Sequence, residues 1–127
     1  MSIYTDSISS TSDKSRIILP LTIHGGQSVS DPLYFGSGIS MIGFFSPSAW
    51  TAARLEFDTS INGTDWFPVF TTTGVVQYAT VSTSCGYIVY TQTFMSFNYV
   101  RFRSGTTASA VIQAADRTFK VVGRAIA

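Results

Sequence analysis

Few residues of this chain are of a type that acts as an acid, a base, a nucleophile or a metal ligand. The 127 residues include one histidine, His24, and one cysteine, Cys85. A zinc site needs several nitrogen or sulfur ligands, and a reactive thiol needs a basic neighbour, which the Ser/Thr-rich sequence around Cys85 lacks. We therefore interpret His24 as a hydrogen-bonded turn residue and Cys85 as an inert thiol, and we expect no metal and no cofactor.

Two carboxylates offer the nearest approach to catalytic chemistry. Glu56 and Asp58 alternate along an apolar strand pattern, which places them on one face, about 7 Å apart. Paired carboxylates in this range can hydrolyse glycosides, but Arg54 shares the face, so we favour a solvated charge cluster. Gly36-Ser37-Gly38 lacks the third glycine and the following helix of a phosphate-binding loop. The sequence therefore predicts a protein that is not an enzyme.

A basic and aromatic stripe is the clearest candidate for binding. Tyr99, Arg101 and Arg103 alternate with the apolar Val100 and Phe102, so the three should share the outward face of one strand. Such a stripe suits nucleic acid, a sugar or an acidic protein surface, and it also suits pairing with an acid on a neighbouring strand. The net charge of +1 gives no broad field for nucleic acid or anionic lipid. We favour internal pairing, with a protein contact as the main alternative, and expect neither nucleic acid nor membrane as a partner.

The composition indicates which elements must position these residues. Fifty-five residues are β-branched or aromatic, whereas twenty are straight-chain helix formers, and 12% are charged. β-branched and aromatic side chains suit a pleated surface, so this balance excludes helical bundles and coiled coils. The chain length fits one domain.

Turn residues about every ten positions divide the chain into eight to ten short strands. This pattern predicts an all-β fold, a β-sandwich or a small barrel. We favour a single β-sandwich over residues 17–127, with a jelly roll as the favoured topology. Pro20 places the strand Arg16–His24 at a sheet edge, and residues 46–53 read as a helical turn or two behind Ser46 and Pro47. The predicted strands are Arg16–His24, Val29–Phe35, Ile39–Phe45, Arg54–Ser60, Asp65–Phe70, Val75–Val81, Tyr87–Thr93, Asn98–Arg103, Ala110–Ala114 and Arg117–Ile126.

Asn62-Gly63 predicts a tight hairpin with a type I′ turn. A two-residue loop sets Phe57 opposite Pro68, which leaves Phe67 and Val69 on the polar face of the partner strand. We therefore count Phe67, Val69 and the aromatic Trp50 among the candidate protein contacts.

Residues 1–16 differ from the rest because they are rich in serine and hold, apart from Met1, only three large apolar side chains, Ile3, Tyr4 and Ile8. Such a stretch cannot offset its own ordering entropy. It is therefore either a frayed terminus or an extended arm that those three residues anchor on a neighbouring subunit. Neither a signal peptide nor a long apolar run is evident, so we expect a protein made in the cytoplasm.

Four motifs together point to a family. They are Phe45-Ser46-Pro47-Ser48-Ala49-Trp50-Thr51-Ala52-Ala53, then Leu55-Glu56-Phe57 with Ser60-Ile61-Asn62-Gly63-Thr64-Asp65-Trp66, then Tyr99-Val100-Arg101-Phe102-Arg103-Ser104-Gly105-Thr106, and Gln113-Ala114-Ala115-Asp116-Arg117. Over residues 45–124 the chain resembles a small structural protein of tailed bacteriophages. The resemblance implies a virion component with a β-sandwich domain, of a kind that includes capsid decoration, or cement, proteins.

The sequence thus leads to two hypotheses about function. The first is a virion structural protein, made in the host cytoplasm, whose dimers or trimers bridge the major capsid protein or other virion proteins. The second is a carbohydrate- or receptor-binding module of a tail or head fibre, with Trp50, Trp66 and Tyr99 as a sugar platform.

Overall fold

The computed structural model describes residues 16–36, 39–88 and 98–125. In these ranges the chain forms nine strands and no helix, so the all-β prediction is confirmed. The strands are β1 (Arg16–Ile23), β2 (Leu33–Tyr34), β3 (Ile39–Phe45), β4 (Arg54–Ser60), β5 (Phe67–Pro68), β6 (Tyr78–Thr80), β7 (Gly86–Ile88), β8 (Tyr99–Ser104) and β9 (Arg117–Ala125).

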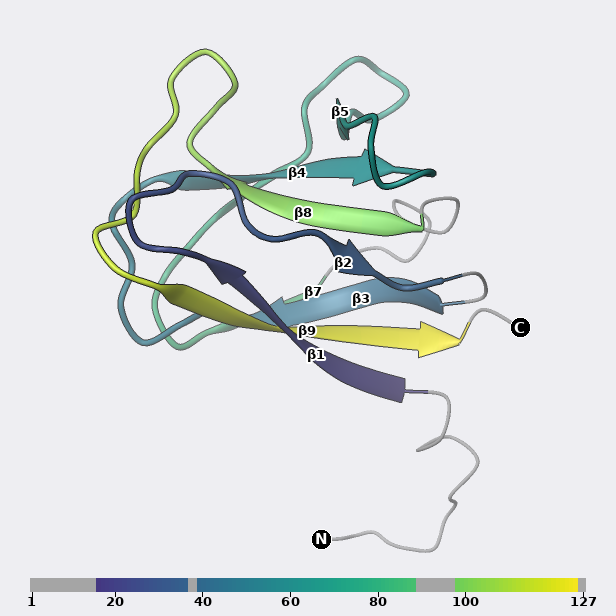
Figure 1. The fold of residues 1–127 in the computed structure, drawn as a ribbon, viewed down its shortest axis with the longest axis horizontal. Helices are drawn as coiled ribbons and strands as arrows, with labels where there is room; N and C mark the ends of the chain where they lie inside the picture. The colour runs from purple at the N-terminus through teal and green to yellow at the C-terminus, as the bar shows by residue number, and fades with distance from the viewer. Residues whose placement is uncertain (1–15, 37–38, 89–97, 126–127) are drawn as a thin grey trace, which may run out of the picture.

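The strands form two antiparallel sheets that face each other as the layers of a β-sandwich (Figure 1). The four-stranded sheet has the order β1-β9-β3-β7, and the five-stranded sheet has the order β2-β8-β4-β5, with β6 also paired to β4. β1 lies at one end of its sheet, as Pro20 predicted. The jelly-roll topology stays a prediction, and the proposed arm lies almost wholly outside the described residues.

An aromatic core fills the space between the sheets. Phe44 of β3, Phe102 of β8 and Phe119 of β9 are almost fully buried and meet edge to face, with ring centroids 5.1–5.8 Å apart. This geometry matches the preferred packing of aromatic rings. The alternation of Val100 with its neighbours had predicted inward positions for Val100 and Phe102, and both side chains are fully buried.

The prediction of a short helix at 46–53 is wrong. Ser46 does not cap a helix, because its hydroxyl donates to the carbonyl of Ser82 at 2.6 Å and accepts from the amide of Cys85 at 2.8 Å. These partners lie more than thirty-five residues further along the chain, so no local signal reports them. The segment therefore runs as a loop that is tied to the turn before β7.

The hairpin after β4 differs by one residue from the predicted register. Asp58 pairs with Pro68, whereas the sequence set Phe57 there. Asn62 does not adopt the positive φ that a type I′ turn requires, although Gly63 does, at 78°. Instead, the Asn62 side-chain oxygen accepts from the amides of Thr64 and Asp65, both at 2.9 Å. The side chain thus closes a wider loop, and a one-residue shift exchanges the two faces of the partner strand.

Ala110–Ala114 is not a strand, and a buried glutamine organises this segment. The Gln113 side chain is fully buried, accepts from the amide of Thr51 at 2.9 Å and donates to the Thr51 carbonyl at 3.0 Å. It also donates to the Ser104 hydroxyl at 2.7 Å. Gln113 therefore fastens the loop before β9 to the loop before β4.

Candidate functional site

The basic stripe lies on the outer face of the five-stranded sheet, where its arginines bind an acid of the neighbouring strand. Arg101 Nε donates to Asp58 Oδ2 at 2.9 Å, and Arg103 donates to the same oxygen. The Asp58 side chain is only 2% exposed, and those of Arg101 and Arg103 are 25% and 16% exposed. The placement matches the internal pairing that we favoured for this stripe, because most of the charge is used within the fold.

The interpretation of Glu56 and Asp58 as a solvated cluster is wrong, since both residues are buried. Arg54 binds Glu56 by Nε at 2.8 Å and by Nη2 at 2.6 Å, and its guanidinium lies 4.3 Å from the centre of the Tyr78 ring. Arg101 lies in the same way 4.5 Å from the ring centre of Trp66. Through these cation–π contacts the rings of Tyr78 and Trp66 cover guanidinium groups that bind the two carboxylates within the sheet.

The aromatic residues of the sugar-platform hypothesis do not form one surface. Trp66 and Tyr99 meet at 6.4 Å on the outer face of the five-stranded sheet, and Tyr34 packs on Tyr99 at 4.7 Å. Trp50 is half-buried elsewhere, with its ring 5.5 Å from Phe119 of the four-stranded sheet and its Nε1 donating to the carbonyl of Ala53. The guanidinium of Arg101 covers one face of the Trp66 ring.

An apolar groove beside β5 is lined by two of the predicted contact residues, Phe67 and Val69. It encloses about 760 Å³, and three large apolar side chains of its lining are exposed: Ile61 at 70%, Phe67 at 63% and Phe70 at 55%. Its remaining lining residues are Thr59, Ser60, Pro68, Val69, Thr71, Thr72 and Gln77. The groove therefore has no charged side chain in its lining.

Phe67 is thus exposed, as the sequence predicted, but Val69 is not. Val69 is 4% exposed and belongs to the hydrophobic core, and its amide donates to the carbonyl of Phe57 at 3.0 Å. The prediction that Val69 faces outward is wrong because the one-residue register shift sets it beside the buried Phe57. The same shift sets Phe67 opposite the buried Thr59, so the predicted face does not account for the exposure of Phe67. The sequence prediction did not include Ile61 and Phe70 among the contact residues. A signal was present for Ile61, because it lies directly before the Asn-Gly turn, where an apolar residue has no core to pack against.

The anchors Ile3, Tyr4 and Ile8 lie outside the described residues.

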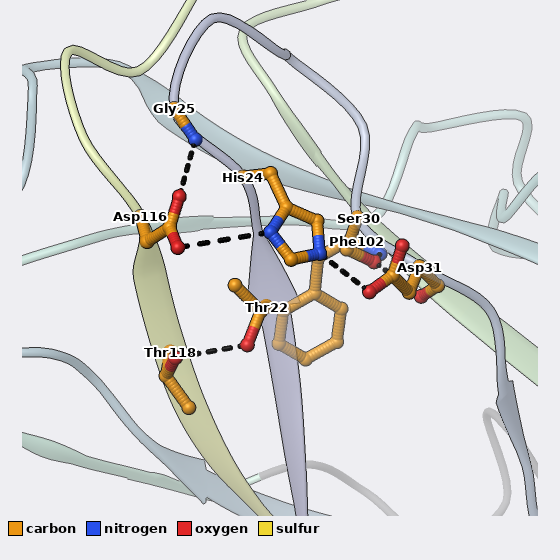
Figure 2. A network of polar contacts seen from close by, with 8 residues as sticks. All are labelled: Thr22, His24, Gly25, Ser30, Asp31, Phe102, Asp116 and Thr118. Atoms are coloured by element: carbon orange, nitrogen blue, oxygen red, sulfur yellow. Dashed lines mark hydrogen bonds and ion pairs between the residues drawn. The ribbon is translucent and has the colours of Figure 1, made fainter.

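His24 ties together the ends of three segments (Figure 2). Its Nε2 lies 2.7 Å from Asp31 Oδ2 and its Nδ1 lies 3.8 Å from Asp116 Oδ2, while the other Asp116 oxygen accepts from the Gly25 amide at 2.8 Å. The hydrogen bond with Asp31, and then the negative charge of Asp31, raise the pKa of His24 above its ordinary value. All three side chains are at least half exposed, so the cluster is a solvated surface clamp, in line with the interpretation of His24 as a turn residue.

Comparisons with known proteins add no family: no family model and no curated protein matches the sequence.

Within the described ranges, no group of three His, Cys, Asp or Glu side chains could hold a metal ion. The same part of the chain contains no helix of the length and apolarity that crossing a bilayer requires. The Cys85 thiol is exposed and lies 3.3 Å from the carbonyl of Thr83.

Proposed function

We propose that this chain is a non-enzymatic structural protein of a bacteriophage virion, a decoration (cement) protein that binds the capsid and bridges its subunits. The observation that carries the proposal is the groove beside β5, where Ile61, Phe67 and Phe70 stay exposed together. Apolar side chains that gather on a protein surface favour a contact with another protein. The resemblance of residues 45–124 to phage structural proteins supports the virion as the place of that contact.

The use of ionisable groups supports a structural role over a catalytic one. Glu56 and Asp58 are each bound to arginine on the outer face of their sheet. An acid and base pair needs at least one carboxylate that can exchange a proton with a substrate. Buried carboxylates that already bind guanidinium groups are poorly suited to that task.

A decoration protein acts by linkage. If it binds the mature shell more tightly than the burst shell, each bound copy stabilises the mature shell by the difference in binding free energy. The neutral groove also suits a contact between copies, because two grooves that meet bring no like charges together. Dimers or trimers on the shell would then add many small energies through multivalent binding.

The central experiment compares phage particles that carry this protein with particles from which its gene has been deleted. We expect the protein in purified heads, and we expect the deletion to lower the temperature at which the heads release their DNA. If the protein is missing from purified heads and DNA release is unchanged, the proposal fails.

The groove is tested by Phe67→Ser, with Ile112→Ser as the matched control, because Ile112 is similarly exposed, at 61%, outside the groove lining. Sedimentation velocity should show concentration-dependent association of the wild type and of the control, and a loss of association in Phe67→Ser. Equal association in all three proteins would exclude the groove as the contact between copies.

A further inference from the structure

The outer face of the four-stranded sheet carries an apolar row that crosses all four strands. The register places Ile18 of β1 beside Val122 of β9, Val122 beside Gly43 of β3, and Gly43 beside Ile88 of β7. Ile18 is 57% exposed and Ile88 is 91% exposed. A sheet of a two-layer sandwich ordinarily presents polar side chains on its outer face, so this row departs from the expected pattern.

The row has a notch where Gly43 contributes no side chain. A hollow of about 260 Å³ lies there, lined among others by Ile42, Phe45, Ile88 and Val122. A Cβ atom at Gly43 would come within 2.6 Å of the Tyr87 carbonyl oxygen, so the close approach of β7 requires glycine. The notch is therefore fixed by the packing of two strands, and it has the size and lining to accept one apolar side chain.

Cations border the row on both sides. Arg16 and Arg124 pair with each other in the register on one side, and Lys120 lies between Pro20 and Phe45 on the other. None of the ion pairs in the described ranges involves these three side chains. Asp116, which lines a neighbouring hollow with Lys120, is bound to the Gly25 amide and lies near His24. The outward positions of the four strands thus carry three positive charges and no acid.

We propose that this face docks onto a protein surface that inserts an apolar side chain into the notch at Gly43 and presents carboxylates to Lys120, Arg16 and Arg124. Complementary charge around an apolar centre gives such a contact its register and partner choice. A second copy of the chain fits poorly, since two such faces would bring three cations of each copy together. The inference rests on the proposed function, because the partner is then a capsid subunit.

The test measures binding to purified heads from the deletion mutant. The variants are Ile88→Ser and Lys120→Glu, with Ile112→Ser and Lys120→Arg as the controls for an exposed apolar residue and for the retained charge. We expect each of the first two to weaken binding about tenfold or more, and each control to stay within about twofold of the wild type. Raising the salt from about 0.05 M to about 0.5 M should weaken wild-type binding.

The outcomes separate this inference from the proposed function. If the wild type does not bind heads, both fail. If Ile88→Ser and Lys120→Glu bind as tightly as the wild type, the docking face is wrong and the proposed function stands. Two further results would overturn the inference: a loss of self-association in Ile88→Ser by sedimentation, which makes a second copy the occupant, or Ile88-dependent binding to vesicles of phosphatidylglycerol and phosphatidylcholine, which makes it a membrane.

Discussion

Replacing Asp58 with asparagine should destabilise the fold far more than a surface acid normally does. The substitution keeps the size of the side chain but removes the charge that Arg101 and Arg103 share. Breaking a buried ion pair by removing one partner costs about 3–5 kcal/mol. Because the two arginines keep part of their contact with water, we expect the lower end of this range, about 3 kcal/mol.

The measurement is urea unfolding followed by tryptophan fluorescence, with the free energy of unfolding compared between wild type and Asp58→Asn. The same loss should lower the melting temperature by about 10 °C for a chain of this size. Asp65→Asn is the control, because Asp65 is exposed and, among the residues that the structure describes, accepts only from Asn62 in the hairpin loop; it should cost less than about 1 kcal/mol.

A double-mutant cycle identifies the cause of the loss. Asp58→Asn combined with Arg103→Gln should show a coupling energy on the order of 1–3 kcal/mol. The reasoning is refuted if Asp58→Asn unfolds within about 1 kcal/mol of the wild type, or if the two substitutions add without coupling. Either result would mean that the cation–π contacts of Tyr78 and Trp66, and not the buried carboxylate, stabilise the outer face of the five-stranded sheet.

Three further predictions concern particular side chains. Gln113→Ala removes the hydrogen-bond partner of the Thr51 amide and carbonyl and of the Ser104 hydroxyl. Thermal unfolding should therefore show a loss of about 2–4 kcal/mol in the free energy of unfolding. The control Gln27→Ala, at an exposed position, should change this free energy little. Gly105→Ala should destabilise more than Gly26→Ala in the same assay: both have φ near 85–88°, but only at Gly105 would a Cβ lie 2.5 Å from a backbone oxygen; equal losses would contradict the packing argument. Because Asp31 raises the pKa of His24, the stability that this pair adds is fully present below the unfolded pKa of about 6.5 and is lost as the pH rises through the folded pKa. The difference in unfolding free energy between wild type and Asp31→Asn should therefore shrink from pH 5.5 to pH 8.5. A difference that stays constant over this range would exclude the stabilising contact between His24 and Asp31.

The strands that the sequence predicted best are those whose signals are local. Ile39–Phe45 and Arg54–Ser60 agree with β3 and β4 at both ends, because turn residues bound each run and alternation marks the inner face of Arg54–Ser60. The buried Asp58 could not be predicted from the same pattern, since its partners follow 43 and 45 residues later. A carboxylate on a strand looks solvated until the neighbouring strand is known.

The groove escaped prediction for a related reason. Its shape depends on the hairpin register, which the side chains of Ser60 and Asn62 set by binding backbone amides within the loop. The Asn-Gly pair identified the turn correctly but not its length. Since one residue of shift exchanges the faces of a strand, the single error moved Val69 from the core to the surface in the prediction.

The distribution of charge sharpens what the composition means. A soluble domain commonly has about 25–35% charged residues on its surface, and this chain has 12% in all. Five of those residues form two groups of ion pairs on the five-stranded sheet, Arg54 with Glu56, and Asp58 with Arg101 and Arg103. The charge that reaches solvent is therefore smaller than the composition suggests, while Ile18, Ile61, Phe67 and Ile88 are exposed. A chain that pairs part of its charge within the fold and leaves apolar groups outside gains most from burial against neighbours, which is the situation that we propose for it as a subunit on a shell.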